Sequence, residues 1–398
     1  MAKINTHYKK LKPSYFFSEM SKRTREFQIK NPGIEVIKLG IGNTTEPLPP
    51  TVIKGLKNGV KKLSNASKYT GYGDEQGDIR LRTALAEWYK KRGIVFDPSE
   101  IFISDGAKPD CANIQSLFSK NAVVAIQNPV YPVYLDSNIL AGRNKIIFMS
   151  CSEKNDFFPD VPKQKIDLIY ICSPNNPTGA VISRKKLSQV VDYAKKHKAI
   201  IIFDAAYSEF ISDSDIPKSI YEIHGAKTCA VEIQSFSKFA GFTGVRLGWS
   251  VVPKQLVAED SIPGQLNQMW NRRQTTMFNG ASNIVQEGGL AVLSEKGQKE
   301  CRKIISYYME NAKIIKTGLT KLGFIVFGGV NAPYLWVKTP NKMSSWEFFD
   351  KLLEEARVVC TPGVGFGSEG EGYVRISSFG HRENIIKAVE GIQKNLKI

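Results

Sequence analysis

One lysine, Lys238, lies in a segment whose composition suits it to form an imine with an aldehyde. Residues 234–249 contain three glycines and mostly apolar neighbours, which disfavour the ammonium form of the lysine and lower its pKa. Ser235, Ser237 and Arg246 add two hydroxyls and a bidentate cation, the groups that bind a phosphate monoester. Together these features suggest pyridoxal phosphate. A glycine-rich turn with an ordinary surface lysine would show the same residues, so this segment alone does not decide.

The elements that must position these residues are strands that alternate with helices. The sequence predicts strands over residues 101–104, 122–127, 167–172, 199–203 and 228–234, and helices over 80–92, 105–117 and 184–197. Apolar strands in this alternation favour a mostly parallel sheet with helices on both faces. Ligands of such sheets bind at the carboxyl ends of the strands. Six candidate residues follow predicted strands: Lys108, Tyr131, Asn176, Asp204, Tyr207 and Lys238.

A change of pattern near residue 285 indicates a second domain. The chain has 398 residues, which is long for one hydrophobic core. Beyond that point strands and helices follow in mixed order, as is typical of a smaller α+β domain. Elements are predicted over residues 294–322, 324–327, 334–338, 345–355, 358–361 and 372–377, and an N-terminal helix over 16–29. We expect an arm (1–45) that contributes to the small domain, a large cofactor-binding α/β domain (46–285) and the small domain (286–398).

The chain is strongly basic, with a formal net charge of +17. A strongly basic chain suggests nucleic acid or an anionic membrane as a possible kind of partner. The lysines are nevertheless spread along the chain among acidic residues, and no nucleic-acid-binding motif accompanies them. A solvated basic face that attracts anionic substrates fits this pattern better. No segment reaches the roughly eighteen consecutive apolar residues of a membrane span. We therefore expect neither nucleic acid nor membrane as a partner.

The cysteines and histidines give no metal-site spacing. The six cysteines are far apart without a CxxC pair, and the four histidines are scattered. No metal site is therefore predicted. Buried thiols fit a reducing compartment, and the N-terminus shows no apolar signal-peptide core. The sequence predicts a cytoplasmic protein.

Three motifs follow one another along the predicted large domain. They are SPNNPTG at residues 173–179, DAAY at 204–207, and SFSK at 235–238 followed by GVRLGW at 244–249. This set resembles the signature of the fold-type-I, class I/II aminotransferases. The resemblance implies pyridoxal 5′-phosphate as cofactor. It also implies a large domain with a mostly parallel central sheet flanked by helices, plus a smaller α+β domain.

Each functional residue also has an ordinary structural explanation. Asp204 could cap a helix, Tyr207 could be a core aromatic residue, and Arg375 could form a surface ion pair. Taken jointly, in this order and with Lys238, they favour the functional interpretation.

The resemblance implies a role for each cofactor residue. Lys238 would hold the cofactor and act as general base, and Asp204 would pair with the pyridinium nitrogen. Tyr207 and Asn176 would bond the 3′ oxygen, and Tyr131 would stack on the ring. The predicted catalytic residues are Lys238, Tyr207 and Asp204. The other predicted cofactor contacts, most of them at the phosphate, are Ala107, Lys108, Ser235, Ser237, Arg246 and Tyr72.

The resemblance also implies a substrate site that two subunits share. Arg375 would clamp the α-carboxylate bidentately and could close over it with the small domain. Tyr72, Glu75 and Asn279 would reach over from a partner subunit, which implies an obligate homodimer. The remaining predicted substrate contacts are Tyr15, Gly42, Lys108, Tyr131 and Asn176.

Four further segments narrow the resemblance. Residues 69–77, 104–108, 276–280 and 331–340 resemble a branch of the family that acts on diaminopimelate. The implied reaction converts tetrahydrodipicolinate and L-glutamate to LL-diaminopimelate and 2-oxoglutarate. An aminotransferase of the general aspartate or aromatic type would share every cofactor residue. A Cβ–S lyase on the same scaffold is another alternative, as is an amino-acid-sensing regulator, although such regulators usually carry an added DNA-binding module.

Overall fold

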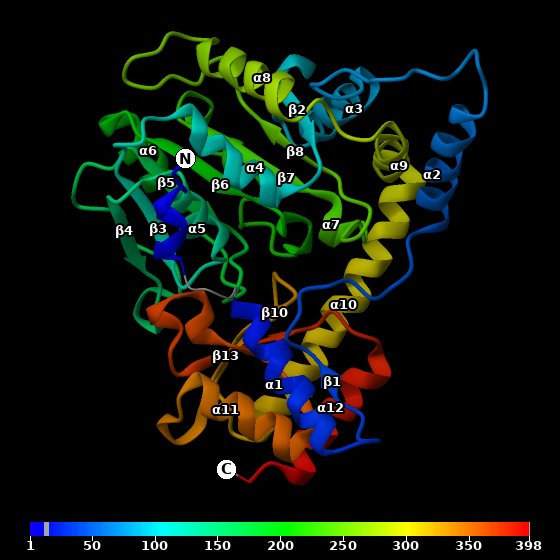
Figure 1. Ribbon diagram of the computed structural model, residues 1–398, viewed down its shortest axis with the longest axis vertical. Helices are drawn as coiled ribbons and strands as arrows, with labels where there is room; N and C mark the ends of the chain where they lie inside the picture. The colour runs from blue at the N-terminus through cyan, green and yellow to red at the C-terminus, as the bar shows by residue number, and fades with distance from the viewer. Residues whose placement is uncertain (12–15, 398) are drawn as a thin grey trace.

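The computed structural model describes residues 1–11 and 16–397. Figure 1 shows an upper unit built around a sheet and a smaller lower unit, with the long helix α10 (Glu295–Lys321) running between them. This arrangement confirms the predicted α/β class, and the long helix predicted over residues 294–322 is present.

The central sheet has seven strands in the order β2-β8-β7-β6-β5-β3-β4. Only β8 runs antiparallel to its neighbours, so the sheet is mostly parallel, as predicted. The five predicted strands are present within one or two residues of their expected bounds. The strands β4 and β8 were not predicted. The bounds are β2 Ile101–Ser104, β3 Val124–Asn128, β4 Ile146–Ser150, β5 Leu168–Cys172, β6 Ile200–Asp204, β7 Ala230–Ser235 and β8 Gly248–Val251.

Alternate side chains of each central strand enter different hydrophobic clusters, so both faces of the sheet are covered. In β5, for example, Ile169 and Ile171 pack in one cluster, and Leu168 and Tyr170 pack in the other. This is the reason for the continuous apolar character of the strands. The helices of this unit are α2 Pro50–Leu63, α3 Ile79–Lys90, α4 Ala107–Asn113, α5 Val133–Leu140, α6 Arg184–His197, α7 Phe236–Phe239, α8 Gln265–Met277 and α9 Asn283–Leu293.

The smaller unit is built on a four-stranded antiparallel sheet, β12-β13-β10-β9. Its hydrophobic cluster joins Met20 and Leu39 to residues between 312 and 392. A two-stranded parallel pair, β1 with β11, ties residues 37–38 to the same unit. The bounds are α1 Phe16–Lys30, β1 Ile37–Lys38, β9 Val326–Gly328, β10 Tyr334–Lys338, α11 Ser345–Lys351, β11 Val358–Val359, β12 Thr361–Pro362, β13 Tyr373–Ser377 and α12 Arg382–Asn395.

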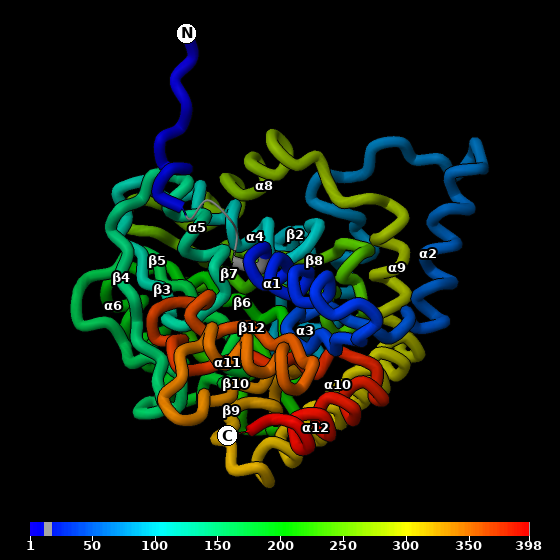
Figure 2. Tube along the Cα trace, turned by 60° about the horizontal axis from the view of Figure 1, so that its bottom comes forward, coloured from blue at the N-terminus to red at the C-terminus, as the bar shows by residue number. Residues whose placement is uncertain are grey.

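Residues 5–10 of the chain lie on the large unit. The 3-10 helix η1 (Thr6–Lys10) packs beside α5, and the side chain of Asn5 donates a hydrogen bond to the Leu140 carbonyl oxygen at 3.4 Å. Figure 2 shows η1 beside α5. It also shows α1 lying across the small unit. Met20 of α1 and the strand β1 pack with the small unit, whereas η1 packs on the large unit. Among the described helices, none is both long and apolar enough to cross a membrane.

Candidate active site

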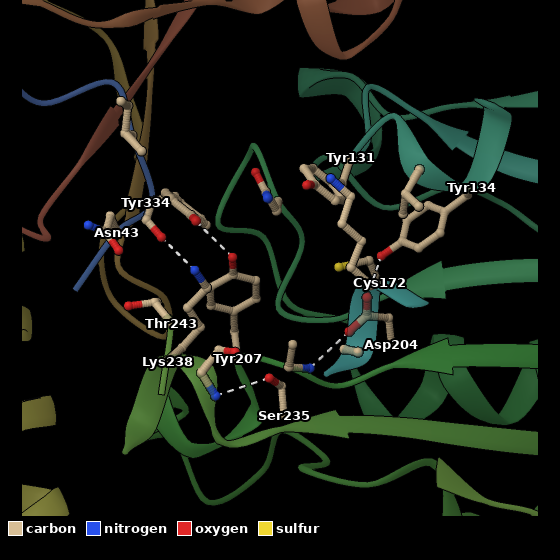
Figure 3. A pocket seen from close by; sticks show the side chains of 18 of the residues that line it. Asn43, Tyr131, Tyr134, Cys172, Asp204, Tyr207, Ser235, Lys238, Thr243 and Tyr334 are labelled. Atoms are coloured by element: carbon tan, nitrogen blue, oxygen red, sulfur yellow. Dashed lines mark hydrogen bonds between the residues drawn. The ribbon is translucent and has the colours of Figure 1, made fainter. Parts of the chain in front are cut away.

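A cavity of about 420 Å³ opens at the carboxyl ends of the sheet strands. Its lining comes from the large unit, from the segment after β1, and from β10 and β13 of the small unit. Figure 3 shows Lys238, Tyr207 and Tyr334 together on one side, and Asp204, Tyr131 and Tyr134 on the other. The cavity brings together twelve of the predicted site residues: Gly42, Ala107, Lys108, Tyr131, Asn176, Asp204, Tyr207, Ser235, Ser237, Lys238, Arg246 and Arg375.

Lys238 enters the cavity from α7, the short helix that begins directly after β7. Its Nζ donates a hydrogen bond to the Gly42 carbonyl oxygen at 2.5 Å. Burial lowers the pKa of Lys238 to about 7, and the nearby charges of Arg375 and Arg246 act in the same direction. A much larger fraction of the amine is therefore neutral near pH 7 than in an ordinary lysine, and the neutral amine is the form that attacks an aldehyde.

This pKa predicts how fast the cofactor-free protein takes up pyridoxal phosphate at different pH values. Because the neutral amine increases about tenfold per pH unit below its pKa, the rate should rise steeply up to about pH 7 and then level off. Stopped-flow absorbance from pH 5.5 to 10 measures it. An amine with an ordinary pKa would give a rate that still climbs at pH 9, and such a profile would contradict the assignment.

Ser235, Ser237 and Arg246, which were predicted to bind a phosphate, lie together in the cavity lining. The backbone N–H of Ser237 donates to Ser235 Oγ at 3.0 Å, and Arg246 Nη1 donates to Ser237 Oγ at 3.3 Å. Gly106 precedes α4 with φ +134°, and a Cβ there would overlap the Arg246 guanidinium. Gly106 is therefore needed for the start of α4 at Ala107 to come close to Arg246.

Among the described residues of the lining, Asp204 is the one acidic residue, and the basic residues are Lys108, Lys238, Arg246 and Arg375. Burial raises the pKa of Asp204, and hydrogen bonds from Tyr134, the Ala206 backbone and Cys111 oppose this increase. Three cationic side chains and the partly protonated Lys238, against one carboxylate, give a cavity that attracts anionic ligands.

Arg375 projects from β13 and is 1% exposed. Nη1 donates to Asn176 Oδ1 and Nη2 donates to the Gly40 carbonyl oxygen, both at 2.6 Å. The guanidinium carbon lies 4.5 Å from the centre of the Tyr334 ring. Within the described chain, Nε has no hydrogen-bond partner and no carboxylate pairs with Arg375. A buried cation without a counter-ion is suited to an anionic ligand.

Tyr207 follows β6, and its hydroxyl lies 2.7 Å from that of Tyr334 on β10. The two rings meet edge to face with centres 5.2 Å apart. Burial raises the pKa of Tyr207, as does the neighbouring Tyr334 hydroxyl, so Tyr207 remains a neutral donor near pH 7. This bond links β10 of the small unit directly to the residues of the large unit that line the cavity.

Gly42 is packed so closely that its substitution has a predictable effect. A Cβ at Gly42 would overlap Tyr334 Oη. The same Cβ would lie 3.1 Å from Tyr334 Cζ, so the hydroxyl oxygen is the atom that overlaps. Gly42→Ala should displace the Tyr334 hydroxyl from Tyr207 and lower the stability by about 1–3 kcal/mol. Thermal melting measures the loss. Adding Tyr334→Phe removes the overlapping atom and should restore most of the stability, and a double variant no more stable than Gly42→Ala would contradict this explanation.

Sequence reasoning missed several residues of the site. Tyr134 and Cys111 bond Asp204, and Tyr334 bonds Tyr207. Tyr134 stands three positions after the predicted Tyr131, a spacing that places both near the start of one helix. Other lining residues that were not predicted are Ile41, Asn43, Val133, Cys172, Ala206 and Thr243.

Three of the other predicted residues, Tyr72, Glu75 and Asn279, are not part of this lining. Tyr72 is 88% exposed, Asn279 is exposed, and Glu75 is partly buried. Tyr15 lies outside the described residues. The segments around Glu75 and Asn279 adjoin, because a Cβ at Gly280 would lie 3.1 Å from the Asp74 carbonyl oxygen. The loop that holds Tyr72 and Glu75 therefore lies beside the segment of Asn279, outside the cavity of their own chain.

The residues present fit a phosphorylated pyridine aldehyde. Lys238 supplies an amine for the aldehyde, Ser235, Ser237 and Arg246 suit the phosphate, and buried Asp204 suits a protonated ring nitrogen. Among the described residues, no group of three or more His, Cys, Asp and Glu side chains is placed to hold a metal ion.

The fold and this site define a pyridoxal-phosphate-dependent aminotransferase, and residues 34–392 match the family described as aminotransferase class I and II. The chain belongs to that family, whose cofactor is pyridoxal 5′-phosphate.

Individual relatives agree with this assignment. The chain is 51% identical over 99% of its length to a protein named LL-diaminopimelate aminotransferase from Agathobacter rectalis, which it covers completely. It is 46% identical to the structure of L,L-diaminopimelate aminotransferase from Chlamydomonas reinhardtii, with a TM-score of 0.93 and coverage of 99% of this chain and 98% of that one. A Thermus thermophilus aspartate aminotransferase variant shares the fold at 22% identity, with a TM-score of 0.86 over 98% of this chain and 99% of that one.

Proposed function

We propose that this chain transfers an amino group between L-glutamate and tetrahydrodipicolinate in its open keto form, giving LL-diaminopimelate and 2-oxoglutarate. The observation that carries the proposal is the 51% identity to the named diaminopimelate enzyme over 99% of the chain. The cavity supports it, because the substrates and products are all dicarboxylates and the lining is rich in cationic side chains.

The large unit holds the cofactor and handles the proton. When bound, pyridoxal 5′-phosphate accepts the amino group and delocalises the electron pair left at the substrate Cα. Lys238 Nζ holds the cofactor and then moves the Cα proton, and a pKa of about 7 suits it to both accept and donate. Asp204 binds the ring nitrogen, and Ser235, Ser237 and Arg246 orient the phosphate. The other residues that would contact the cofactor are Ala107, Lys108, Tyr131, Asn176, Tyr207 and, from a second copy of the chain, Tyr72.

The two ends of the substrate meet different groups. Arg375 binds the α-carboxylate with its two terminal nitrogens, beside Asn176. Lys108, exposed near the Tyr131 ring, faces the far carboxylate. Glu75 from a second copy faces the distal ammonium of diaminopimelate, which glutamate lacks. The other substrate contacts proposed are Tyr15, Gly42, Tyr72, Tyr131 and Asn279.

We infer that the enzyme is a homodimer whose copies complete each other's sites. Tyr72, Glu75 and Asn279 are grouped outside the cavity of their own chain, and exposed apolar side chains lie near them in the sequence. Met277 is 70% exposed and Tyr69 is 62% exposed. An apolar surface of this kind is typical of an interface between proteins.

Mixed dimers test the sharing of sites. A chain with Lys238→Ala and a chain with Tyr72→Ala and Asn279→Ala should each be nearly inactive alone. After dissociation and reassociation of equal amounts, half of the dimers are mixed and each has one intact site. Activity should then return to about a quarter of that of the unmodified enzyme. Native mass spectrometry, which separates the three dimers by mass, confirms mixing, and no recovery in proven mixed dimers would refute shared sites.

Absorption spectroscopy tests the proposed substrate. Adding LL-diaminopimelate to the cofactor-loaded enzyme should convert pyridoxal phosphate to pyridoxamine phosphate, whereas L-aspartate should not. Equal conversion by both amino acids would indicate an aminotransferase of general aspartate or aromatic type. Release of pyruvate from cystathionine would indicate a lyase.

We also propose a cytoplasmic location and two domains that meet near residue 285. All six cysteines are buried and free, which suits a reducing compartment. The separate hydrophobic cluster of residues 312–392 supports a small domain joined by the arm through Met20 and Leu39, with boundaries near 45 and 285.

A further inference from the structure

Asp204, to which we assign the ring nitrogen of the cofactor, is held by three donors. Tyr134 Oη donates to Asp204 Oδ2 at 2.6 Å, and Cys111 Sγ donates to the same oxygen at 3.3 Å. The backbone N–H of Ala206 donates to Oδ1 at 3.0 Å. Figure 3 shows the bond from Tyr134 to the Asp204 carboxylate. A carboxylate has about four acceptor positions, so the described donors leave one for the cavity.

The groups that bind Asp204 are buried, so their hydrogen bonds determine the state of its carboxylate. Tyr134 is 1% exposed and Cys111 is fully buried, so neither donor can be replaced by bulk water. Burial raises the pKa of Asp204, and the bond from Tyr134 is the largest opposing influence. A hydroxyl donating to a carboxylate at 2.6 Å is a strong charge-assisted bond, whereas a thiol at 3.3 Å is a weak donor.

We propose that Tyr134, assisted by Cys111, is a positioning residue that keeps Asp204 ionised and directs its remaining acceptor position at the ring nitrogen of the cofactor. The inference rests on the proposed role of Asp204 and is independent of the proposed substrate.

Tyr134 is itself held firmly. It lies in the first turn of α5, and its ring stacks on that of Tyr170 with centres 5.2 Å apart. The ring would keep its packing in Tyr134→Phe, so this substitution removes the hydroxyl alone.

The test compares two ligands of the cofactor-free protein. One is pyridoxal 5′-phosphate, and the other is its carbocyclic analogue, in which C–H replaces the ring nitrogen. Tyr134→Phe should weaken binding of the natural cofactor about tenfold, the effect of losing one bond to a charged group. It should change binding of the analogue less than twofold, because the analogue makes no use of Asp204. Cys111→Ala should show the same selectivity with a smaller loss.

Two controls separate the possible failures. Tyr170→Phe removes an equally buried hydroxyl, which donates to the Cys111 carbonyl oxygen at 3.4 Å and not to Asp204, and it should affect neither ligand. Asp204→Asn should abolish the preference for the natural cofactor, and its failure to do so would refute the role of Asp204. If Asp204→Asn behaves as expected but Tyr134→Phe weakens both ligands equally or neither, Tyr134 is only a packing residue and the inference is overturned.

Discussion

Replacing Lys238 by alanine should abolish transamination, with a fall in kcat/KM of at least about 10⁴-fold. Two functions are lost together, because the same amine holds the cofactor and moves the proton at Cα, and proton transfer alone contributes up to roughly 10⁴-fold. Among the described residues, the other lysine of the lining is Lys108, which is exposed beside Tyr131 and does not replace the buried amine of Lys238. Steady-state kinetics with LL-diaminopimelate measures the loss.

The fold should survive this change. Folding lowers the pKa of Lys238 from 10.5 to about 7. Below pH 7 the buried ammonium therefore destabilises the native state. This destabilisation is relieved as the pH rises from 7 towards 10.5. Removing the side chain should therefore leave the melting temperature unchanged or raise it below pH 7. Added methylamine should recover part of the activity by supplying an amine in the vacated space.

Lys316 provides a matched control. It is another lysine whose pKa is lowered by burial, and it donates to a glycine carbonyl, that of Gly328, at 2.9 Å. It does not line the cavity. Lys316→Ala should keep its cofactor and stay within a few-fold of normal activity. If Lys238→Ala kept more than a hundredth of the activity, the assignment of Lys238 would be wrong.

Local chain order placed some of the predicted residues at the site, whereas the roles of others, such as Arg375, came from the resemblance to the family. Asp204 and Lys238 follow apolar strands, and parallel strands end at one edge of the sheet, so their meeting could be anticipated. Tyr334 reaches Tyr207 from β10, 127 positions away, in the other unit. The position of Tyr334 in the sequence contains no information about its contact with Tyr207.

The helix α2 shows why some elements could not be predicted. It begins at Pro50 and contains Gly55 and Gly59, which lower helix propensity. A Cβ at Gly55 would lie 2.6 Å from the Ala291 Cβ, and one at Gly59 would lie 2.9 Å from the Ile284 Cα. The glycines therefore permit close packing against α9. Tertiary packing stabilises this helix, and a reading of local propensity cannot detect it.

Replacing Arg375 by lysine should lower kcat/KM for α-amino acids about 100-fold, mainly through KM. The guanidinium offers a rigid pair of donors to a carboxylate, and lysine offers a single point charge. Losing one charge-assisted bond costs about 1.5–3 kcal/mol, and misalignment of Cα with Lys238 adds to this. Kinetics with LL-diaminopimelate and with L-glutamate should show equal losses, because both substrates present an α-carboxylate.

The structural consequences of this substitution can be separated from the chemical ones. Arg375 also bonds Asn176 and the Gly40 carbonyl oxygen, so some loss of stability is expected. Binding of pyridoxal phosphate should nevertheless be nearly unchanged, because the phosphate subsite lies on Ser235, Ser237 and Arg246. Arg382→Lys is a matched control in the small unit, where Arg382 lies over the Tyr307 ring and bonds Glu310 outside the cavity.

A primary amine without a carboxylate gives the decisive comparison. Its slow reaction with the bound cofactor uses Lys238 and cannot use a carboxylate clamp, so Arg375→Lys should leave that rate within about threefold while slowing α-amino acids about 100-fold. Equal slowing of both kinds of donor would mean that Arg375 acts only by holding the small unit against the cavity, and the clamp would be refuted. Because the clamp comes from β13 and the amine from α7, a selective loss would also show that substrate binding spans both units of the chain.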